Sequence, residues 1–355
     1  MSRRRTHEYD ESDVRVRPSR RGTRPRTKER PRHEDAETGL VVGVDRGRYT
    51  TLVTTDGAHG TGGDHGADGE RTVIAMKARE LGRKGIVIGD EVALVGDTSG
   101  EPDSLARIVR VEPRRSVLRR TADDTDPYER VIVANADQMV VVTALAEPEP
   151  RPRMVDRCLV AAYDAGLQPL LVLTKADLAD PASFVGSYAP LDVPYVVTHR
   201  EPDGTIVGLD AVRERLRGRR SVFIGHSGVG KSTLVNALVP DADRSVGHVN
   251  EVTGRGRHTS TSAVALRLPG REGWVIDTPG VRSFGLAHID LARIINAFPD
   301  LEPGTAGCPR GCTHDEPDCA LDEWVEQGHA GPAGRSRLDS LRRVLRARSG
   351  TETSD

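Results

Sequence analysis

A glycine-rich segment in the second half of the chain constrains the fold more than any other feature. It reads GHSGVGKST and continues the apolar run SVFI. This spacing matches a phosphate-binding loop, which connects a buried strand to a helix and holds nucleotide phosphates. Its glycines let backbone N–H groups surround phosphate oxygens, and the positive end of the following helix faces the same anion. The segment therefore predicts an α/β nucleotide-binding domain. Its positions are Gly225, His226, Ser227, Gly228, Val229, Gly230, Lys231, Ser232 and Thr233.

A second motif, DTPG at residues 277–280, ends the apolar run GWVI. In nucleoside triphosphate hydrolases a carboxylate in this place holds Mg²⁺, and a backbone N–H faces the γ-phosphate. We therefore expect Asp277 to reach Mg²⁺ through water and Gly280 to face the γ-phosphate. Within the phosphate loop, Lys231 is expected to reach the β- and γ-phosphates and Ser232 to ligate Mg²⁺.

A third motif, TKAD, follows the apolar run LLVL. A carboxylate at its fourth position can accept both N–H groups of the guanine edge, a donor pair that adenine lacks. The stem of Lys175 can lie over the purine plane. The motif therefore predicts GTP as the nucleotide. Its residues are Thr174, Lys175, Ala176 and Asp177.

The order of these motifs indicates a permuted domain. In ordinary small GTPases the phosphate loop comes first, whereas here Asp177 precedes Lys231. Circular permutation is tolerated where the original termini lie close together on the surface. It places the Asp277 motif next to the C-terminal boundary of the domain, where an attached domain can respond to the γ-phosphate.

The stretch GRGRHTSTSA, between the phosphate loop and Asp277, holds candidates for nucleotide sensing. Either Thr259 or Thr261 is a candidate for the threonine that closes on Mg²⁺ and the γ-phosphate. Gly280 is followed by Val281, where many GTPases carry a glutamine that orients water. His258 is a candidate for that role, and a solvent-exposed loop histidine without a role is the alternative.

Three of the four cysteines lie close together near the C-terminus. Three thiolates and one imidazole form a tetrahedral Zn²⁺ set, and four protein ligands leave no open position, so the ion is expected to be structural. Cys158 lies in the apolar segment CLVAAY and is expected in the core. The predicted ligands are Cys308, Cys312, His314 and Cys319.

The rest of the chain divides by composition. Residues 1–38 hold eleven Arg and one Lys but almost no apolar residues, so we expect a disordered basic arm, either a solvated tail or an arm that contacts RNA phosphates. Short β-rich runs predict an OB-type barrel over 39–120. The runs VIVANADQMVVVTAL and LQPLLVLTKAD predict buried parallel strands, so a three-layer α/β domain is expected over 121–285. The zinc-binding helical domain, with the basic helix LDSLRRVLRAR near its end, is expected over 286–349, and a tail over 350–355.

No run of about 18 apolar residues is present, and the N-terminus lacks an apolar stretch. These features predict a cytoplasmic protein that does not span a membrane. The formal net charge of −2 gives the whole chain no general attraction to polyanions.

The motif order TKAD, GHSGVGKST, GRGRHTST, DTPG and then Cys-Cys-His-Cys resembles the RsgA family, the bacterial ribosome small-subunit-dependent GTPases. The resemblance covers about residues 39–345. It implies an OB barrel, a circularly permuted GTPase domain and a C-terminal zinc domain. We also expect a monomer that binds GTP and GDP, with Mg²⁺ and one structural Zn²⁺. Such a protein would contact the 30S subunit and its 16S rRNA, assist late maturation, and hydrolyse GTP faster on the subunit. His258 matches the histidine considered for catalysis in the family.

Three departures from the family pattern stand out. Thr174 replaces the commoner Asn, which we expect to weaken bracing of the loop while leaving Asp177 in place. The base-side element after VPYVV reads Thr198-His199 instead of Ser-Ala. The zinc spacings are each about one residue short, which keeps His329 as a substitute ligand.

Other functions fit parts of the pattern. A scaffold that binds RNA and carries a structural nucleotide would bind GTP without turnover. A kinase with a phosphate loop is disfavoured by Asp177, because guanine specificity is uncommon there. A GTPase switch acting on a different RNA or particle is the main alternative.

Overall fold

The computed structural model divides into two units, residues 1–34 and Asp35–Asp355, and the elements below belong to the second. Residues 1–32 of the predicted basic arm and the predicted C-terminal tail lie outside the described residues. The described residues are 33, 35–54, 69–82, 85–120, 129–240, 263–278 and 294–349.

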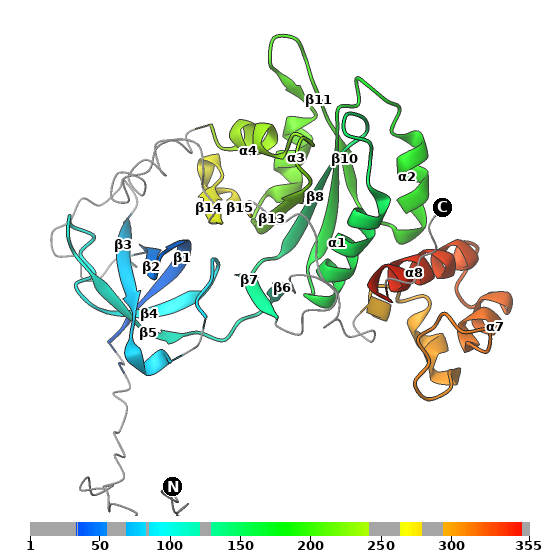
Figure 1. The fold of residues 1–355 in the computed structure, drawn as a ribbon, viewed down its shortest axis with the longest axis horizontal. Coiled ribbons are helices and arrows are strands. Elements are labelled where there is room, and N and C mark those ends of the chain that lie inside the picture. Colours follow the sequence, from blue (N-terminus) through cyan, green and yellow to red (C-terminus); the bar gives the residue numbers. More distant parts are fainter. Residues whose placement is uncertain are drawn as a thin grey trace, which may run out of the picture. The chain divides into compact units, whose positions relative to one another are not determined.

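Five strands near the N-terminus form a closed barrel (Figure 1). Their order is β1-β2-β3-β5-β4, and β4 pairs with β1 to close the sheet, which leaves no unpaired edge. Only the β3–β5 pairing is parallel. The predicted OB-type barrel is confirmed. The strands are β1 (Glu37–Asp45), β2 (Arg48–Thr54), β3 (Glu70–Lys77), β4 (Glu91–Gly96) and β5 (Ala106–Val111), with a 3₁₀ turn η2 (Arg79–Leu81).

Alternating side chains fill this barrel. Val41, Val73 and Ile108 are fully buried in its core, as expected where every second residue of a strand faces inward. The β1–β2 hairpin turns at Arg46 and Gly47, whose φ angles of 44° and 81° are both positive. Two residues with positive φ make the tight turn that matches strand twist.

The α/β domain is built on a mostly parallel sheet with the order β10-β9-β8-β13-β15-β14. Neighbours from β10 to β15 are parallel, and β14 is antiparallel to β15. β14 also pairs with β1 through Val264 and Gly43. The strands are β8 (Gln138–Ala144), β9 (Gln168–Thr174), β10 (Tyr195–Val197), β13 (Arg219–Gly225), β14 (Val264–Arg267) and β15 (Gly273–Asp277).

Helices cover both faces of this sheet (Figure 1). Val141 packs in one core with Cys158 of α1, and Val142 packs in the other with Leu216 of α3 and Leu238 of α4. The predicted three-layer α/β architecture and the core position of Cys158 are confirmed, and burial raises the pKa of this thiol to about 12. The helices are α1 (Pro152–Asp164), α2 (Ala182–Tyr188), η3 (Ala189–Leu191), α3 (Leu209–Leu216) and α4 (Lys231–Leu238).

The run VIVANADQMVVVTAL, expected as a single buried parallel strand, is divided into two strands. It breaks at Asn135, whose φ is 54° and whose amide donates to Gly89 O and accepts from Arg115 N. Only its second half, β8, enters the parallel sheet. Its first half, β7 (Arg130–Ala134), pairs antiparallel with β6 (Val117–Arg120). A further hairpin joins β11 (His199–Arg200) and β12 (Ile206–Val207).

The C-terminal part is helical. The predicted basic helix is confirmed as α8, which begins earlier than the run LDSLRRVLRAR. Leu338, Leu341 and Val344 lie three residues apart on α8 and are fully buried. No helix in the described ranges is long and apolar enough to span a membrane. The remaining elements are η4 (Pro269–Arg271), η5 (Glu302–Gly307), α7 (Ala320–Glu326) and α8 (Gly334–Ser349).

Candidate nucleotide and metal sites

The three predicted nucleotide motifs meet at one edge of the sheet. Gly225 ends β13, Thr174 ends β9 and Asp277 ends β15, and these strands run in the same direction. Strand β8 lies between β9 and β13 and aligns Val142 with Gly225 and Ala144 with Thr174. Ligands of open α/β sheets bind outside the carboxyl ends of the strands, so this edge is the candidate nucleotide site.

The phosphate loop requires its glycines for two different reasons. Gly228 and Gly230 have φ angles of 84° and 87°, which favour glycine. Gly225 lies so close to β8 that an added Cβ would be 2.7 Å from the carbonyl oxygen of Val142. Helix α4 begins within the motif, at Lys231. The local sequence therefore folds as the motif predicts, with a helix N-terminus facing the site.

An ion pair connects the phosphate loop to the end of β15. The Lys231 Nζ donates to Asp277 Oδ1, and both side chains are mostly buried, with 14% and 23% of their surface exposed. Thr278 follows and donates its hydroxyl to Phe223 O of β13 at 3.1 Å. Ser232 lies exposed in the first turn of α4. The structure thus brings together a cation suited to phosphate and oxygen ligands suited to Mg²⁺.

Thr174 bonds directly to the phosphate loop. Its hydroxyl donates to Val229 O at 2.7 Å, and its own carbonyl accepts from Leu145 N at 3.0 Å. Because Thr174 stands where the family commonly has Asn, we expected weaker bracing of the loop. The structure nevertheless has a direct bond between the guanine motif and the phosphate loop.

The remaining residues of the guanine motif lie in a tight turn. Lys175 has a φ of 59°, and its Nζ donates to Glu147 O. Ala176 N donates to Thr198 O at 3.2 Å, which connects the turn to the end of β10. Asp177 is exposed, and within the described part of the chain its carboxylate has no hydrogen-bond or ion-pair partner. This carboxylate can therefore accept hydrogen bonds from a base.

The base-side element, Thr198-His199, connects β10 to the β11–β12 hairpin. His199 pairs with Glu201 through Nε2 and Oε1 at 3.0 Å, in the β11–β12 hairpin. Thr198 donates both its backbone N–H and its hydroxyl to Leu173 O, at 2.7 and 3.3 Å. Thr198, which stands where the family pattern has Ser, therefore connects the end of β10 to β9 through Leu173.

Several predicted residues lie outside the described residues. These are the candidate water-orienting histidine, the two candidate switch threonines and the glycine of the DTPG motif, namely His258, Thr259, Thr261 and Gly280. Their roles stay predictions.

The four predicted zinc ligands come together. Their ligand atoms all lie within 4.8 Å of one another. Cys308 Sγ lies 3.8 Å from Cys319 Sγ and 3.6 Å from His314 Nδ1. A tetrahedral Zn²⁺ with bonds of about 2.3 Å to sulfur separates its ligands by about 3.8 Å, so the residues fit this ion. His329 lies outside this cluster, and its ring packs at a tilt against the Trp324 ring with the centroids 4.4 Å apart.

Polar contacts outside the cluster hold the loop that carries it. Glu316 accepts from the backbone and side chain of Thr313, and Arg342 Nε of α8 donates to His314 O at 3.0 Å. Arg342 is itself fixed by Asp322. No local sequence pattern marks these residues. Outer hydrogen bonds of this kind orient metal ligands.

Comparisons with known proteins settle the family. A family described as RsgA GTPase matches residues 111–287. The small ribosomal subunit biogenesis GTPase RsgA of Gemmatimonas aurantiaca is 36% identical over 306 residues, covering 84% of this chain and 99% of that relative. This chain belongs to the RsgA family of GTPases. The RsgA of Pseudomonas aeruginosa is 38% identical over 284 residues, covering 79% of this chain and 80% of the relative.

Solved structures share the fold. The crystal structure of YjeQ from Thermotoga maritima has a TM-score of 0.60 and 24% identity, and covers 89% of this chain and 99% of that one. YloQ, described as a circularly permuted GTPase, has a TM-score of 0.58 and 22% identity, and covers 92% and 99%. The predicted permuted order is therefore confirmed as an RsgA-family architecture.

Two arginines attach the C-terminal helix of this RsgA-family chain to the α/β domain. Arg343 Nε lies 3.3 Å from Asp156 Oδ2 of α1, whose side chain is only 3% exposed. The same guanidinium stacks over Tyr188 at 4.8 Å. Arg337 donates to Pro190 O at 2.8 Å and to Asp300. In the sequence both look like solvated residues of a basic helix, and no local signal marks them.

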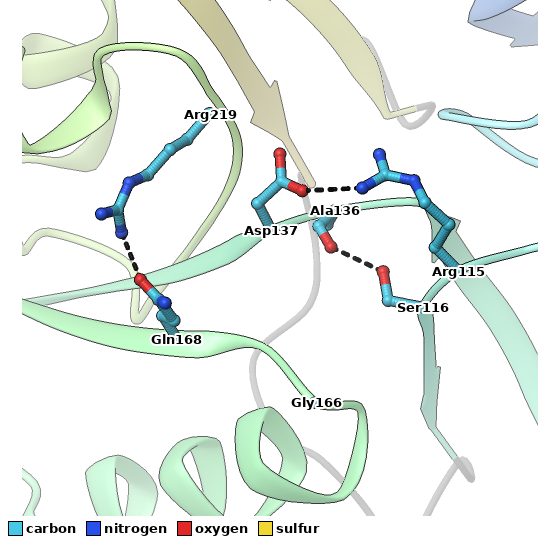
Figure 2. Close-up of a pocket in the computed structure, with 7 residues that line it drawn as sticks. All are labelled: Arg115, Ser116, Ala136, Asp137, Gly166, Gln168 and Arg219. Atoms are coloured by element: carbon cyan, nitrogen blue, oxygen red, sulfur yellow. Dashed lines mark hydrogen bonds and ion pairs between the residues drawn. The ribbon is translucent and has the colours of Figure 1, made fainter.

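A polar pocket of about 380 Å³ lies at the other edge of the same sheet (Figure 2). Arg115 pairs there with Asp137 at 3.3 Å, and Arg219 donates to Gln168, so its polar groups already satisfy one another. The pocket is formed at the amino ends of β8, β9 and β13, opposite the motifs. It is therefore not the nucleotide site of this RsgA-family chain. Its lining residues are Arg115, Ser116, Ala136, Asp137, Gly166, Gln168 and Arg219.

Proposed function

We propose that this chain hydrolyses GTP on the small ribosomal subunit and assists the late maturation of that subunit, with hydrolysis stimulated by the subunit. The observation that carries the proposal is the convergence of three nucleotide motifs at one sheet edge, with Thr174 bonded to Val229. The ribosomal partner is supported by the relatives, which are small ribosomal subunit biogenesis GTPases by name.

In this proposal each motif holds one part of the nucleotide. Asp177 reads the two N–H groups of guanine, the stem of Lys175 covers the purine, and Thr174 and Ala176 shape the turn. The backbone of the loop from Gly225 to Thr233 surrounds the phosphates. This division follows from the order of the motifs along the sheet edge, from β9 through β13 to β15.

Hydrolysis requires charge stabilisation at the γ-phosphate. Bound Mg²⁺ neutralises phosphate charge, and Ser232 and Asp277 are the residues proposed to hold it. Lys231 leaves Asp277 to bind the β- and γ-phosphates, which frees the carboxylate for this role. Gly280 is proposed to donate its N–H to the γ-phosphate, Thr259 or Thr261 to close over the site, and His258 to orient water.

The zinc cluster is proposed to be structural. Four protein ligands leave no open coordination position for catalysis. Zinc would fix the Cys308–Cys319 loop, which Arg342 holds against α8. The chain between Asp277 and this loop is the proposed path by which the γ-phosphate controls the C-terminal domain. Arg343 and Arg337 of α8 supply a second connection, to α1 and to the α2–η3 segment that follows the guanine motif.

The proposed domains are the barrel over 39–120, the GTPase domain over 121–285 and the zinc-binding domain over 286–349. It describes a cytoplasmic monomer that exchanges GTP and GDP and contacts 16S rRNA. A basic arm over residues 1–38 would add electrostatic attraction to RNA.

The test is GTP turnover with purified 30S subunits, with 50S subunits and with neither. The proposal predicts stimulation by 30S alone, and Lys231→Ala should abolish it. Absence of stimulation contradicts the ribosome-coupled mechanism, and stimulation by another RNA or particle supports the alternative switch. Phosphate transfer to a small molecule would instead indicate a kinase.

A further inference from the structure

The turn that follows β8 touches both halves of the candidate nucleotide site. Glu147 O accepts from Lys175 Nζ of the guanine motif. One residue later, Pro148 Cδ lies 3.6 Å from the point where a Cβ on Gly228 would be. The turn is anchored behind these contacts by the buried Leu145, whose N–H donates to Thr174 O.

These two contacts place the turn along the nucleotide. The base lies at the guanine motif and the phosphates lie at the loop, and in every nucleoside phosphate the ribose connects the two. A turn that contacts Lys175 on one side and Gly228 on the other therefore lies beside the ribose. Glu147 also has a φ of 48°, which is uncommon outside glycine and tends to occur at ligand sites.

Glu147 has a carboxylate available for this position. Its side chain is exposed, and among the residues that the structure describes the carboxylate has no hydrogen-bond or ion-pair partner. Carboxylates bind ribose hydroxyls in dinucleotide sites by accepting their hydrogen bonds. Exposure to water screens the repulsion between Glu147 and the nucleotide phosphates.

We propose that the Glu147–Pro148 turn forms the ribose side of the nucleotide site, and that the Glu147 carboxylate accepts a hydrogen bond from a ribose hydroxyl. The inference rests on the proposed binding of guanine nucleotides. It makes Glu147 a specificity-determining residue that distinguishes ribonucleotides from deoxyribonucleotides, a property that the three sequence motifs do not supply.

The test is calorimetric titration of the full chain with GDP, 2′-deoxy-GDP and 3′-deoxy-GDP. The wild type should bind one of the deoxy nucleotides about tenfold more weakly than GDP, the lower end of what a charge-assisted hydrogen bond supplies. Glu147→Ala should bind GDP about tenfold more weakly and lose this discrimination. Asparagine tolerates a positive φ, and Glu147→Asn should likewise bind GDP more weakly and lose the discrimination. Glu149→Gln, two residues further along the exposed turn, should retain wild-type discrimination.

The outcomes separate this inference from the function on which it rests. The ribose contact is wrong if the wild type binds GDP and both deoxy nucleotides equally, or if both Glu147 variants keep the wild-type ratio. In either case the binding of guanine nucleotides stands. If the wild type binds no guanine nucleotide, the proposed function itself fails. Equal loss of discrimination in Glu149→Gln would contradict the assignment to Glu147. Circular dichroism of each variant checks that it is folded.

Discussion

Replacing Thr174 with Val tests whether the guanine motif and the phosphate loop act as one unit. Thr174 is buried, with 7% of its surface exposed, and its hydroxyl donates to Val229 O at 2.7 Å. Val has nearly the same shape, so the exchange leaves no cavity and removes mainly this bond. A buried acceptor that loses its partner costs about 1–3 kcal/mol. If about 1–2 kcal/mol of this falls on the nucleotide-bound state, GDP affinity drops by about 5- to 30-fold.

Calorimetric titration with GDP measures the loss of affinity. Urea unfolding of the nucleotide-free protein measures how much of the lost free energy destabilises the fold itself. Thr198→Val is the matched control, because its buried hydroxyl donates to Leu173 O inside the sheet and not to the phosphate loop. We expect it to change GDP affinity by less than about twofold. Thr174→Asn supplies a new donor and should recover most of the affinity. Wild-type affinity in Thr174→Val, or equal losses in the two Val variants, would show that the Thr174–Val229 bond does not support nucleotide binding.

Three further predictions address the base, the metal and the C-terminal helix. Asp177→Asn should weaken GDP binding by at least about 100-fold, because the amide cannot accept both guanine donors. The variant should prefer xanthosine diphosphate to GDP. Competition titrations measure both affinities, and an unchanged preference for guanine would contradict the role of Asp177. Zinc removal by a chelator should lower the thermal midpoint of unfolding. Atomic absorption should find well below one zinc ion per chain in Cys312→Ser. Purified wild-type protein without bound zinc would contradict the structural metal site. Arg343→Met should cost about 1–3 kcal/mol in the free energy of unfolding, because the buried Asp156 carboxylate loses this ion pair while its other contacts remain. Arg346→Gln removes an exposed pair with Asp315 and should cost less than about 1 kcal/mol; urea unfolding compares the two, and equal costs would remove the special role of Arg343.

The sequence predicted those features that local chemistry determines. The phosphate loop needs an apolar strand before it and positive φ at Gly228 and Gly230, and the glycines in the motif meet that need. The zinc ligands lie within twelve residues of one another, so their chemistry is visible as a spacing. The barrel strands show as short alternating runs between turn residues, such as Arg46 and Gly47.

Features that depend on distant contacts were not visible. The break at Asn135 comes from hydrogen bonds to Gly89 and Arg115, far away in the chain. Arg343 resembles any solvated arginine until α8 lies against α1 and Asp156. Glu147 belongs to no motif, and its position beside Lys175 appears only when β8 and β9 pair. These contacts join segments that no sequence spacing relates.

Sedimentation with 30S subunits tests the central claim most directly. The full chain is mixed with purified subunits in a non-hydrolysable GTP analogue, in GDP or without nucleotide, and the bound fraction is measured after centrifugation through a sucrose cushion. A switch controlled by the γ-phosphate predicts strong binding with the analogue and clearly weaker binding with GDP, and Lys231→Ala should lose this difference. Binding that is equal with the analogue and with GDP would contradict a switch controlled by the γ-phosphate.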